Sequence, residues 1–339
     1  MKAVALTHYL QPDNPASLFD TDLPVPSPAA NDLLVEVKAV SVNPLDNRVR
    51  RPKDKVEASP RVLGWDAAGI VTAVGSAVSL FRPGDRVYYA GELGRQGSNS
   101  QFQVVDERIV GAMPATFSFE EAAALPMSAL TAWEALFDRL RVGCDVAKNA
   151  NKTILIVGAA GGVGSIAVQL AGKVAGLRVI ATASREASAA WVRQLGAQDV
   201  IDHRGDMLVQ LAALGVPQVD YVLLLNDSDM HLPAACQAVA PQGAICIVAE
   251  ASKPINFGPL WEKSASLVWE MVFTRLESVP GERQRHHDIL SAVARLADAG
   301  TIRSTLGQVV SPINAQTLRD AHATLAAGKT IGKIVLKDF

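Results

Sequence analysis

A glycine-rich segment carries the clearest chemical signal in the sequence. The apolar run 153–157 leads directly into Gly158-Ala159-Ala160-Gly161-Gly162-Val163-Gly164-Ser165, and a helical pattern follows. Glycines let the backbone approach a pyrophosphate, and a helix N-terminus offers N–H groups and positive potential. Ala159 stands in place of the first glycine of the usual GxGxxG. We expect a dinucleotide site formed by Ala160, Gly161, Gly162, Val163 and Gly164; the alternative is a tight turn that binds nothing.

The next predicted strand, 178–183, indicates which dinucleotide binds. Sites for NAD usually carry Asp or Glu about 20 residues after the glycine motif. Here the strand ends in Ser184-Arg185, and Glu186 follows within the next helix start. Ser184 can donate to a phosphate and Arg185 can pair with one in fork geometry. These residues favour NADPH; the alternative for Arg185 is a solvated surface charge.

Composition excludes several other classes of protein. The 339 residues are 49 % hydrophobic and 19 % charged, which is too apolar for general disorder. The net charge of −2 lacks the basic excess of a nucleic-acid binder. No apolar run approaches the roughly 18 residues of a membrane span, and the N-terminal one is too short for a signal peptide. Three cysteines without CxxC spacing favour a reducing, cytoplasmic location.

The arrangement of predicted elements indicates an α/β protein of two domains. The first third contains short strand-like runs separated by Pro and Gly, such as 33–40, 69–75 and 86–89. Helices are expected near 120 and over 131–140, and from Thr153 onward strands and helices alternate. Those later strands are continuously apolar, which is typical of a parallel sheet covered by helices on both faces. Two helices, 289–299 and 315–327, precede a closing strand, 333–336, that could pair with the N-terminal domain.

Five motifs occur in the order found in one known superfamily. The chain resembles the medium-chain dehydrogenases/reductases, in particular their zinc-independent quinone oxidoreductase-like branch and a bacterial subgroup labelled zinc-type alcohol dehydrogenase-like. The resemblance implies a Rossmann dinucleotide-binding domain over 128–283. It also implies a GroES-like catalytic domain over 1–127 that is completed by 284–339. It further implies a homodimer that pairs through an edge strand near 244–248. The motifs are segments 41–46, 63–69, 83–87, 159–164 and 332–336.

Zinc-dependent members of the superfamily hold their catalytic metal with Cys, His and Cys. By alignment of the motifs, Asn43, Trp65 and Met127 stand at or near those places, and none is a suitable ligand. The segment 90–112 also lacks the four cysteines of a structural zinc lobe. We therefore expect no metal.

Without a Lewis acid, alcohol oxidation is difficult, whereas quinones and α,β-unsaturated carbonyls spread the charge of an incoming hydride onto oxygen. The prediction is an NADPH-dependent reductase of a small-molecule quinone or enone. Two alternatives stay open: an alcohol or aldehyde oxidoreductase, and a protein that binds NADPH without turnover.

Four residues are candidates for the catalytic centre, each with a structural alternative. Asn43 could donate to a substrate oxygen or a ribose hydroxyl, or simply shape the turn before Pro44. Asp46 could orient that network or cap a helix, and Asp66 could orient its neighbours or be structural. Trp65 is an apolar wall or a donor. The stretch after Asn43-Pro44 lacks the tyrosine of some relatives, so the proton would come from solvent or the cofactor ribose.

Further residues are expected along the cofactor. The ends of later strands provide the candidate nicotinamide and ribose walls, and His203 lies either beside the adenosine or on a surface loop. Three aromatic residues, Trp133, Trp269 and Phe273, line a substrate pocket or belong to the core. The remaining cofactor candidates are Thr131, Asn226, Val248, Ala249 and Lys333.

Overall fold

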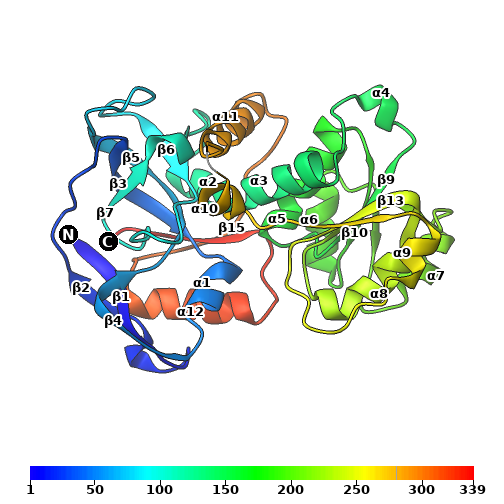
Figure 1. The fold of residues 1–339 in the computed structure, drawn as a ribbon, viewed down its shortest axis with the longest axis horizontal. Helices are drawn as coiled ribbons and strands as arrows, with labels where there is room; N and C mark the ends of the chain where they lie inside the picture. Colours follow the sequence, from blue (N-terminus) through cyan, green and yellow to red (C-terminus); the bar gives the residue numbers. More distant parts are fainter. Residues whose placement is uncertain (280) are drawn as a thin grey trace. The chain divides into compact units, whose positions relative to one another are not determined.

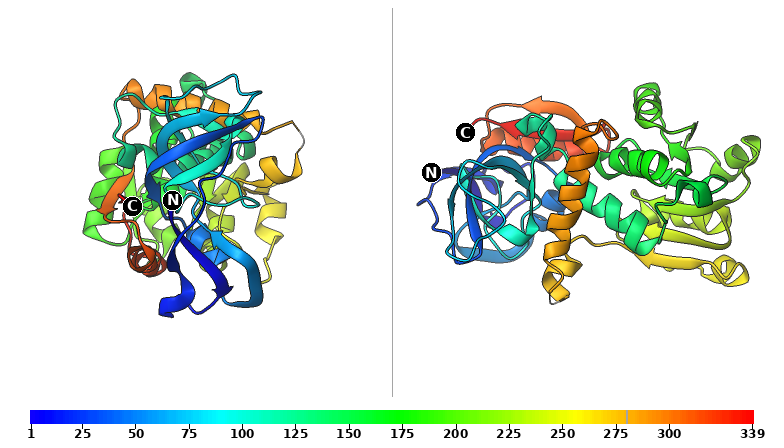
Figure 2. Two further views of the ribbon diagram at one scale, coloured as in Figure 1. Left: turned by 90° about the vertical axis from the view of Figure 1, so that its left-hand side faces the viewer. Right: turned by 90° about the horizontal axis from the view of Figure 1, so that it is seen from above.

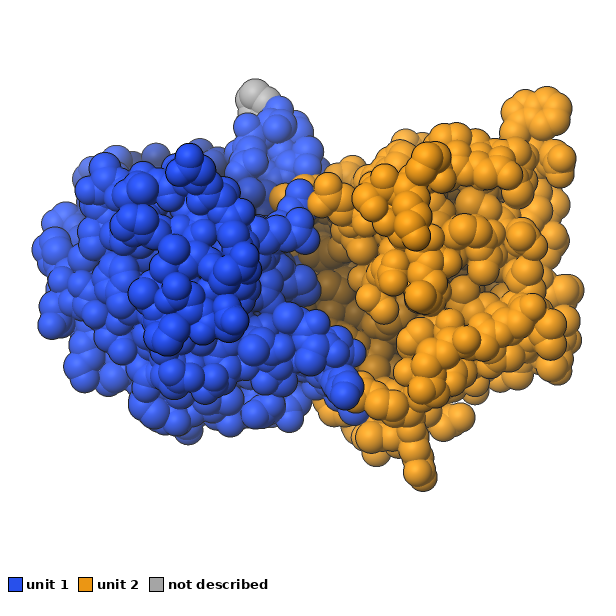
Figure 3. Space-filling model, turned by 90° about the horizontal axis from the view of Figure 1, so that it is seen from below, with its two compact units in different colours: residues 1–127, 273–299, 304–339 blue, residues 128–272, 300–303 orange. Residues whose placement is uncertain are grey.

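The computed structural model describes residues 1–279 and 281–339, which form two compact units (Figure 3). Unit 1 comprises Met1–Met127, Phe273–Ala299 and Ser304–Phe339, and unit 2 comprises Ser128–Val272 and Gly300–Arg303. The chain therefore returns to unit 1 at Phe273, whereas the sequence motifs indicated a domain boundary at 284. Phe273 is fully buried in the core, and Trp269 is 55 % exposed.

Unit 1 is built on two β-sheets (Figure 1). Within the described residues a small antiparallel sheet has the order β2-β1-β4, and a larger sheet has the order β15-β16-β3-β5-β6-β8, with β7 paired to β3. The closing strand β16 pairs antiparallel with β3, as the sequence predicted. The strands are β1 Lys2–Tyr9, β2 Phe19–Asp22, β3 Asp32–Ser41, β4 Lys53–Val62, β5 Asp66–Val74, β6 Arg86–Tyr89, β7 Phe102–Asp106, β8 Val110–Ala112, β15 Leu306–Val310 and β16 Lys333–Lys337.

Two helices of unit 1, α2 and α12, begin where a capping side chain satisfies one of their first N–H groups. At α2 the Ser118 hydroxyl accepts from the Glu121 N–H at 3.2 Å, while the Glu121 carboxylate accepts from the Ser118 N–H at 2.9 Å. The long helix α11, seen along its length in Figure 2, packs on β8. The helices are α1 Pro44–Val49, α2 Phe119–Ala123, α10 Thr274–Ser278, α11 Gln284–Asp298 and α12 Ala315–Ala326, with 3-10 turns at Pro15–Ser17 and Glu107–Ile109.

Unit 2 contains a parallel sheet whose described strands have the order β11-β10-β9-β12-β13-β14. Strand β9 lies centrally, and the chain proceeds outward from it first on one side and then on the other. This is the Rossmann strand order, and in such sheets ligands bind at the carboxyl ends of the strands where the order reverses. The strands are β9 Thr153–Val157, β10 Arg178–Thr182, β11 Asp199–Ile201, β12 Val219–Leu224, β13 Val239–Ile247 and β14 Ser266–Trp269.

Apolar side chains from these strands and their helices form the core of unit 2, including Leu155, Val222, Leu224 and Ile245. The helix expected over 131–140 is present, and strands and helices alternate after Thr153 as expected. Two helices, α3 and α5, continue as π-helical turns at Glu134–Arg139 and Leu170–Val174. No described helix is long and apolar enough to cross a membrane. The helices are α3 Pro126–Trp133, α4 Val146–Asn149, α5 Gly162–Gln169, α6 Glu186–Leu195, α7 Met207–Ala213, α8 Ser228–Ala238 and α9 Gly258–Glu262.

The prediction that segment 244–248 forms the edge strand of unit 2 is wrong. Segment 244–248 belongs to β13, which pairs with β12 on one side and with β14 on the other. The strand at the edge is β14, whose four residues gave too short a pattern for the sequence to indicate a strand.

Candidate functional site

The glycine-rich turn of unit 2 connects β9 to α5. Gly158 has φ +83°, a left-handed conformation that favours glycine, and Gly161 is the N-cap of α5. A Cβ atom on Gly164 would lie 2.5 Å from the Ala159 Cα, so only glycine allows this close approach of helix and turn. The first N–H groups of α5 point out of the helix end, where an anion can accept them. The turn therefore fits a dinucleotide pyrophosphate.

Two neighbouring strand ends support this turn. The Gly158 N–H donates to the Thr182 hydroxyl of β10 at 3.0 Å. On the other side, a Cβ on Gly158 would lie 3.0 Å from the Asn226 Cβ, which places Asn226 directly beside the turn. Val248 and Ala249 follow β13: the Val248 N–H donates to the Leu224 carbonyl, and the Ala249 carbonyl accepts from the Ser228 hydroxyl. Thr131 is buried in α3.

The ends of β10 and β11 bring a second arginine to the expected phosphate position. Arg204, which the sequence analysis did not select, donates through Nη2 to the Ser184 carbonyl at 2.5 Å. The same guanidinium donates hydrogen bonds to the Asp202 carboxylate and lowers the pKa of that carboxyl to about 2. Arg185 is the N-cap residue of α6. Arg204 could have been selected by noting that β10 and β11 are neighbouring parallel strands, because their carboxyl ends, and hence Ser184 and Arg204, then lie at one edge of the sheet.

His203 lies beside these residues and is half-buried. Its ring packs edge-on against His231 of α8, with 5.6 Å between ring centroids. Burial lowers the pKa of both imidazoles, so both are neutral near pH 7. His203 thus borders the edge that carries Ser184, as a neutral ring.

A separate polar cluster in unit 1 centres on Asp66, the first residue of β5. Its Oδ2 accepts from the Asn43 amide at 2.9 Å and from the Lys333 ammonium at 3.0 Å. Its Oδ1 accepts from the Met127 N–H at 2.7 Å. All of these groups are buried. One carboxylate therefore connects the segments 41–46, 63–66, 126–127 and 333.

The hydrogens of Asn43 and Lys333 are committed within this cluster. The Lys333 ammonium donates to Asp66, to the Val42 carbonyl and to Asn43 Oδ1, which uses its three N–H groups. The Asn43 amide donates to Asp66 and, at 3.3 Å, to the Ser41 carbonyl. In this arrangement both side chains hold the cluster together. Contact of Lys333 with a cofactor, and of Asn43 with a substrate, stays a prediction.

Asp46 holds the turn that carries Asn43. Its Oδ2 accepts the Asn43 N–H at 2.7 Å at the start of α1. The side chain is 1 % exposed, and burial raises its pKa to about 7 against the opposing effects of the Asn43 N–H and of Lys333. Trp65 is also buried. The four predicted catalytic residues thus lie in the same part of unit 1.

The residues at the expected metal position do not fit a zinc ion. Asn43, Trp65 and the Met127 backbone surround Asp66, and these groups include no Cys or His ligand. Across residues 1–279 and 281–339 no three His, Cys, Asp or Glu side chains lie together as a metal site.

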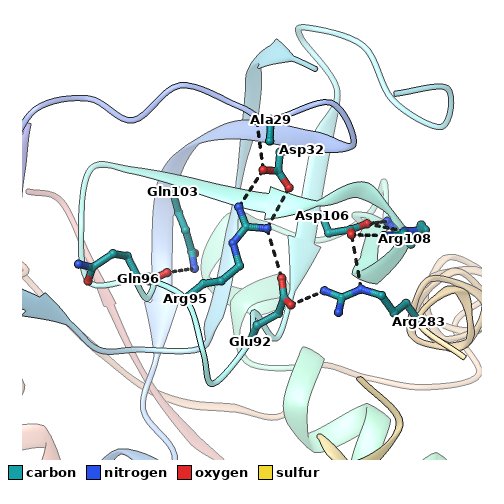
Figure 4. Close-up of polar contacts among 9 residues, drawn as sticks. All are labelled: Ala29, Asp32, Glu92, Arg95, Gln96, Gln103, Asp106, Arg108 and Arg283. Atoms are coloured by element: carbon teal, nitrogen blue, oxygen red, sulfur yellow. Dashed lines mark hydrogen bonds and ion pairs between the residues drawn. The ribbon is translucent and has the colours of Figure 1, made fainter. Parts of the chain in front are cut away.

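Ion pairs hold the segment in which a structural zinc lobe would lie. Arg95 binds Asp32 of β3 through two hydrogen bonds of 2.9 and 2.8 Å (Figure 4). Glu92 pairs with Arg95 and with Arg283, and Arg283 also reaches Asp106 at 3.4 Å. The Gln103 amide donates to the Gln96 carbonyl at 3.0 Å. These contacts connect segment 92–108 to β3 and to the residue before α11.

Comparisons with known proteins agree with both units. Residues 29–133 match the family described as alcohol dehydrogenase GroES-like domain, and residues 195–336 match the family described as zinc-binding dehydrogenase. A zinc-type alcohol dehydrogenase-like protein of Staphylococcus epidermidis is 35 % identical over 337 residues, which cover 99 % of this chain and 99 % of that one.

Two solved structures extend the comparison over the whole chain. A Rhizobium etli CFN 42 protein, described as a candidate zinc-dependent alcohol dehydrogenase, has a TM-score of 0.95 and 46 % identity, covering 100 % of this chain and 98 % of that one. A quinone oxidoreductase from Pseudomonas syringae pv. tomato DC3000 has a TM-score of 0.82 and 26 % identity, covering 99 % of each chain.

The contrast between two glycines tests the geometry of the turn. Gly164→Ala is expected to cost about 1–3 kcal/mol of unfolding free energy, because its methyl group would overlap the Ala159 backbone. Gly161→Ala is the control, since its methyl group would meet only the Gly158 carbonyl, at 3.6 Å. Urea unfolding of both variants measures the difference. Equal losses in the two variants would contradict the close approach at Gly164.

Proposed function

The chain belongs to the medium-chain dehydrogenase/reductase superfamily, in its quinone oxidoreductase-like branch, and from that membership we propose an NADPH-dependent reductase of quinones or α,β-unsaturated carbonyls that works without a metal ion. The superfamily and its nicotinamide cofactor set the reaction class, which is hydride transfer. The choice of NADPH and of a conjugated acceptor rests on residues of this chain.

The composition of the Asp66 cluster is the observation that carries the proposal. Where a zinc enzyme places a Lewis acid, this chain places an amide, a carboxylate and an ammonium that satisfy one another. Such a centre cannot lower the pKa of an alcohol as a metal does. A quinone or enone needs less help, because conjugation carries the new charge to an oxygen that requires only hydrogen-bond donors and a dry surrounding.

NADPH supplies the hydride when it is bound. The turn from Gly158 to Gly164 would hold the pyrophosphate. Ser184 and Arg185 would bind the ribose phosphate, and Arg204 adds a second positive charge at that edge. No carboxylate stands at the tip of β10 to take the ribose hydroxyls of NADH, since Ala183, Ser184 and Arg185 come before Glu186, which opens α6. Asp202, after β11, is already paired with Arg204.

In unit 1 we assign the substrate-facing role to Asn43. Its bond to the Ser41 carbonyl, at 3.3 Å, is longer than its bond to Asp66, so the Ser41-directed N–H is the one it can redirect to a substrate oxygen. Asp66 and Lys333 orient the amide, Asp46 orients its backbone, and Trp65 contributes an apolar wall. The proton that completes the reduction would come from solvent or the cofactor ribose, because segment 47–51 contains no tyrosine.

We also propose that the protein is a homodimer built on the edge strand β14. One side of β14 pairs with β13, and the other side presents main-chain N–H and C=O groups beside the exposed Trp269. An exposed edge strand of this kind is a template for pairing with a second copy.

Activity and metal content test the proposed reaction together. The purified protein is expected to oxidise NADPH when a quinone or an enone is added, to do so unchanged after treatment with a chelator, and to contain no stoichiometric zinc by elemental analysis. Alcohol oxidation that a chelator abolishes would support the alcohol dehydrogenase alternative. Tight NADPH binding with no stopped-flow oxidation by any acceptor would support a binding protein without turnover.

Cofactor preference tests the phosphate site. Arg185→Ala is expected to weaken NADPH binding by roughly 10- to 150-fold, because a charge-assisted hydrogen bond contributes about 1.5–3 kcal/mol, while NADH binding changes little. Arg193→Ala, which removes an exposed arginine from the same helix, is the control. Fluorescence titration with both nucleotides measures the effect. Equal weakening of both nucleotides would remove Arg185 from the phosphate site.

Light scattering tests the dimer. The expected mass is twice that of one 35.9 kDa chain, and Trp269→Arg should shift it toward the single-chain value by placing a charge beside the β14 edge. Val146→Arg alters an exposed apolar residue on α4 and should leave the mass unchanged. A wild-type mass of 35.9 kDa at micromolar concentration would rule the dimer out.

A further inference from the structure

His322 of α12 lies buried between a cation and an anion on α1 and its C-cap. Its Nδ1 lies 2.8 Å from Arg50 Nη1, and its Nε2 lies 3.9 Å from Asp46 Oδ1. The imidazole and the two charged side chains are each at most 2 % exposed. Asn47 of α1 donates to the His322 carbonyl at 3.0 Å, which connects the two helices at this point.

The tautomer of His322 follows from its partner. A guanidinium has only donors, so Nδ1 must accept from Arg50 and carries no proton. The proton of the neutral ring therefore sits on Nε2 and faces Asp46 Oδ1. Burial and the nearby Arg50 charge lower the pKa of His322 to about 3, which keeps the ring neutral at working pH. At 3.9 Å from Asp46 Oδ1 the Nε2–H is too far for a hydrogen bond, and it has no other partner among the described residues, so it acts on the carboxylate as a buried dipole directed at its charge.

Arg50 needs an anion that its direct contacts do not supply. Its Nη2 donates to the Ser17 hydroxyl and the Pro12 carbonyl, both uncharged, and Arg319 adds a further positive charge nearby. A buried charge is costly without compensation. Asp46 interacts favourably with Arg50, and the imidazole lies between them, able to accept from the cation and donate toward the anion.

The other charged groups that act on Asp46 come from two strands. Lys333 of β16 favours its carboxylate form, and Asp66 of β5 disfavours it. The His322 Nε2 lies 3.9 Å from Oδ1, the opposite oxygen from the one that accepts the Asn43 N–H, and Arg50 adds a favourable charge interaction with Asp46. The four groups together decide whether Asp46 is a carboxylate and hence how firmly it holds Asn43.

We propose that His322, with its tautomer set by Arg50, is a positioning residue whose Nε2–H favours the carboxylate form of Asp46 and thereby stabilises the Asn43 turn. The consequence for catalysis rests on the proposed function, in which Asn43 faces the substrate. The consequence for Asp46 does not, because the carboxylate can be observed directly.

Two substitutions of similar shape distinguish the acceptor Nδ1 of the imidazole from its donor Nε2. His322→Asn places an acceptor near the former Nδ1 and can still receive Arg50, but it has no donor that reaches Asp46. His322→Gln places an amide N–H₂ near the former Nε2 and keeps an N–H directed at Asp46. Infrared titration of the buried carboxyl group, identified as the band that Asp46→Asn removes, reports the pKa of Asp46 in each variant.

The wild-type carboxyl is expected to titrate near pH 7. His322→Asn should raise its pKa by about one unit, because losing an N–H dipole directed at the carboxylate disfavours the ionised form. His322→Gln should leave it near the wild-type value. The rate of NADPH oxidation should fall with decreasing pH as Asp46 is protonated, and the midpoint of this fall should move with the pKa of Asp46. At a pH below the wild-type midpoint, His322→Asn should therefore be about tenfold slower than the wild type. Equal shifts in both variants, or no shift in either, would overturn the proposal.

A third variant covers the case in which His322→Asn does not fold. Arg50→Met removes the cation and frees the tautomer, so it too should raise the pKa of Asp46; an unchanged pKa overturns the proposal. Infrared shifts as expected in a protein that reduces no quinone or enone would retain the role of His322 and reject the proposed function. Normal reduction of a quinone or enone, with the pKa of Asp46 unchanged in the His322 variants, would retain the proposed function and reject the role of His322.

Discussion

The buried carboxylate of Asp66 is the group on which the other members of the polar cluster in unit 1 depend. It lies at the start of β5 and accepts hydrogen bonds from Asn43, Met127 and Lys333, which come from three different parts of the chain. Removing one partner from a buried ion pair leaves an uncompensated charge and costs about 3–5 kcal/mol. The cluster is thus stable only when complete, which makes the positions of Asn43 and the β16 start mutually dependent. Asp46 and His322 extend the same constraint outward to α12.

Unit 2 reaches its geometry by a different route. Its glycine-rich turn is shaped by backbone conformation and by the close approach at Gly164, not by charge. The parallel strand order then brings the ends of β10 and β11 together, so that two arginines share one edge. A turn shaped by its backbone suits any dinucleotide, and in the proposed function the side chains at the strand ends select among nucleotides.

The polar groups of unit 1 distinguish this chain from an enzyme that holds a catalytic zinc ion. The names of several similar proteins mention zinc, whereas the residues of this chain form a polar cluster whose groups satisfy one another and an ion-paired segment at 92–108. In a low-dielectric interior such groups are strong when paired with one another. They can orient an amide donor, as the proposed reduction of a conjugated carbonyl requires.

The sequence by itself determined the elements and the nucleotide turn, because local patterns suffice for these: the glycine spacing, the apolar strands from Thr153 onward and the closing strand at 333–336. It did not reveal that β14 forms the sheet edge, that Arg204 lies beside Ser184, or that Lys333 joins Asn43 across 290 residues. It also gave no reason to select His322. Only the tertiary structure decided these points, since which charged groups meet in a buried interior depends on how distant elements pack, and no local pattern records that packing.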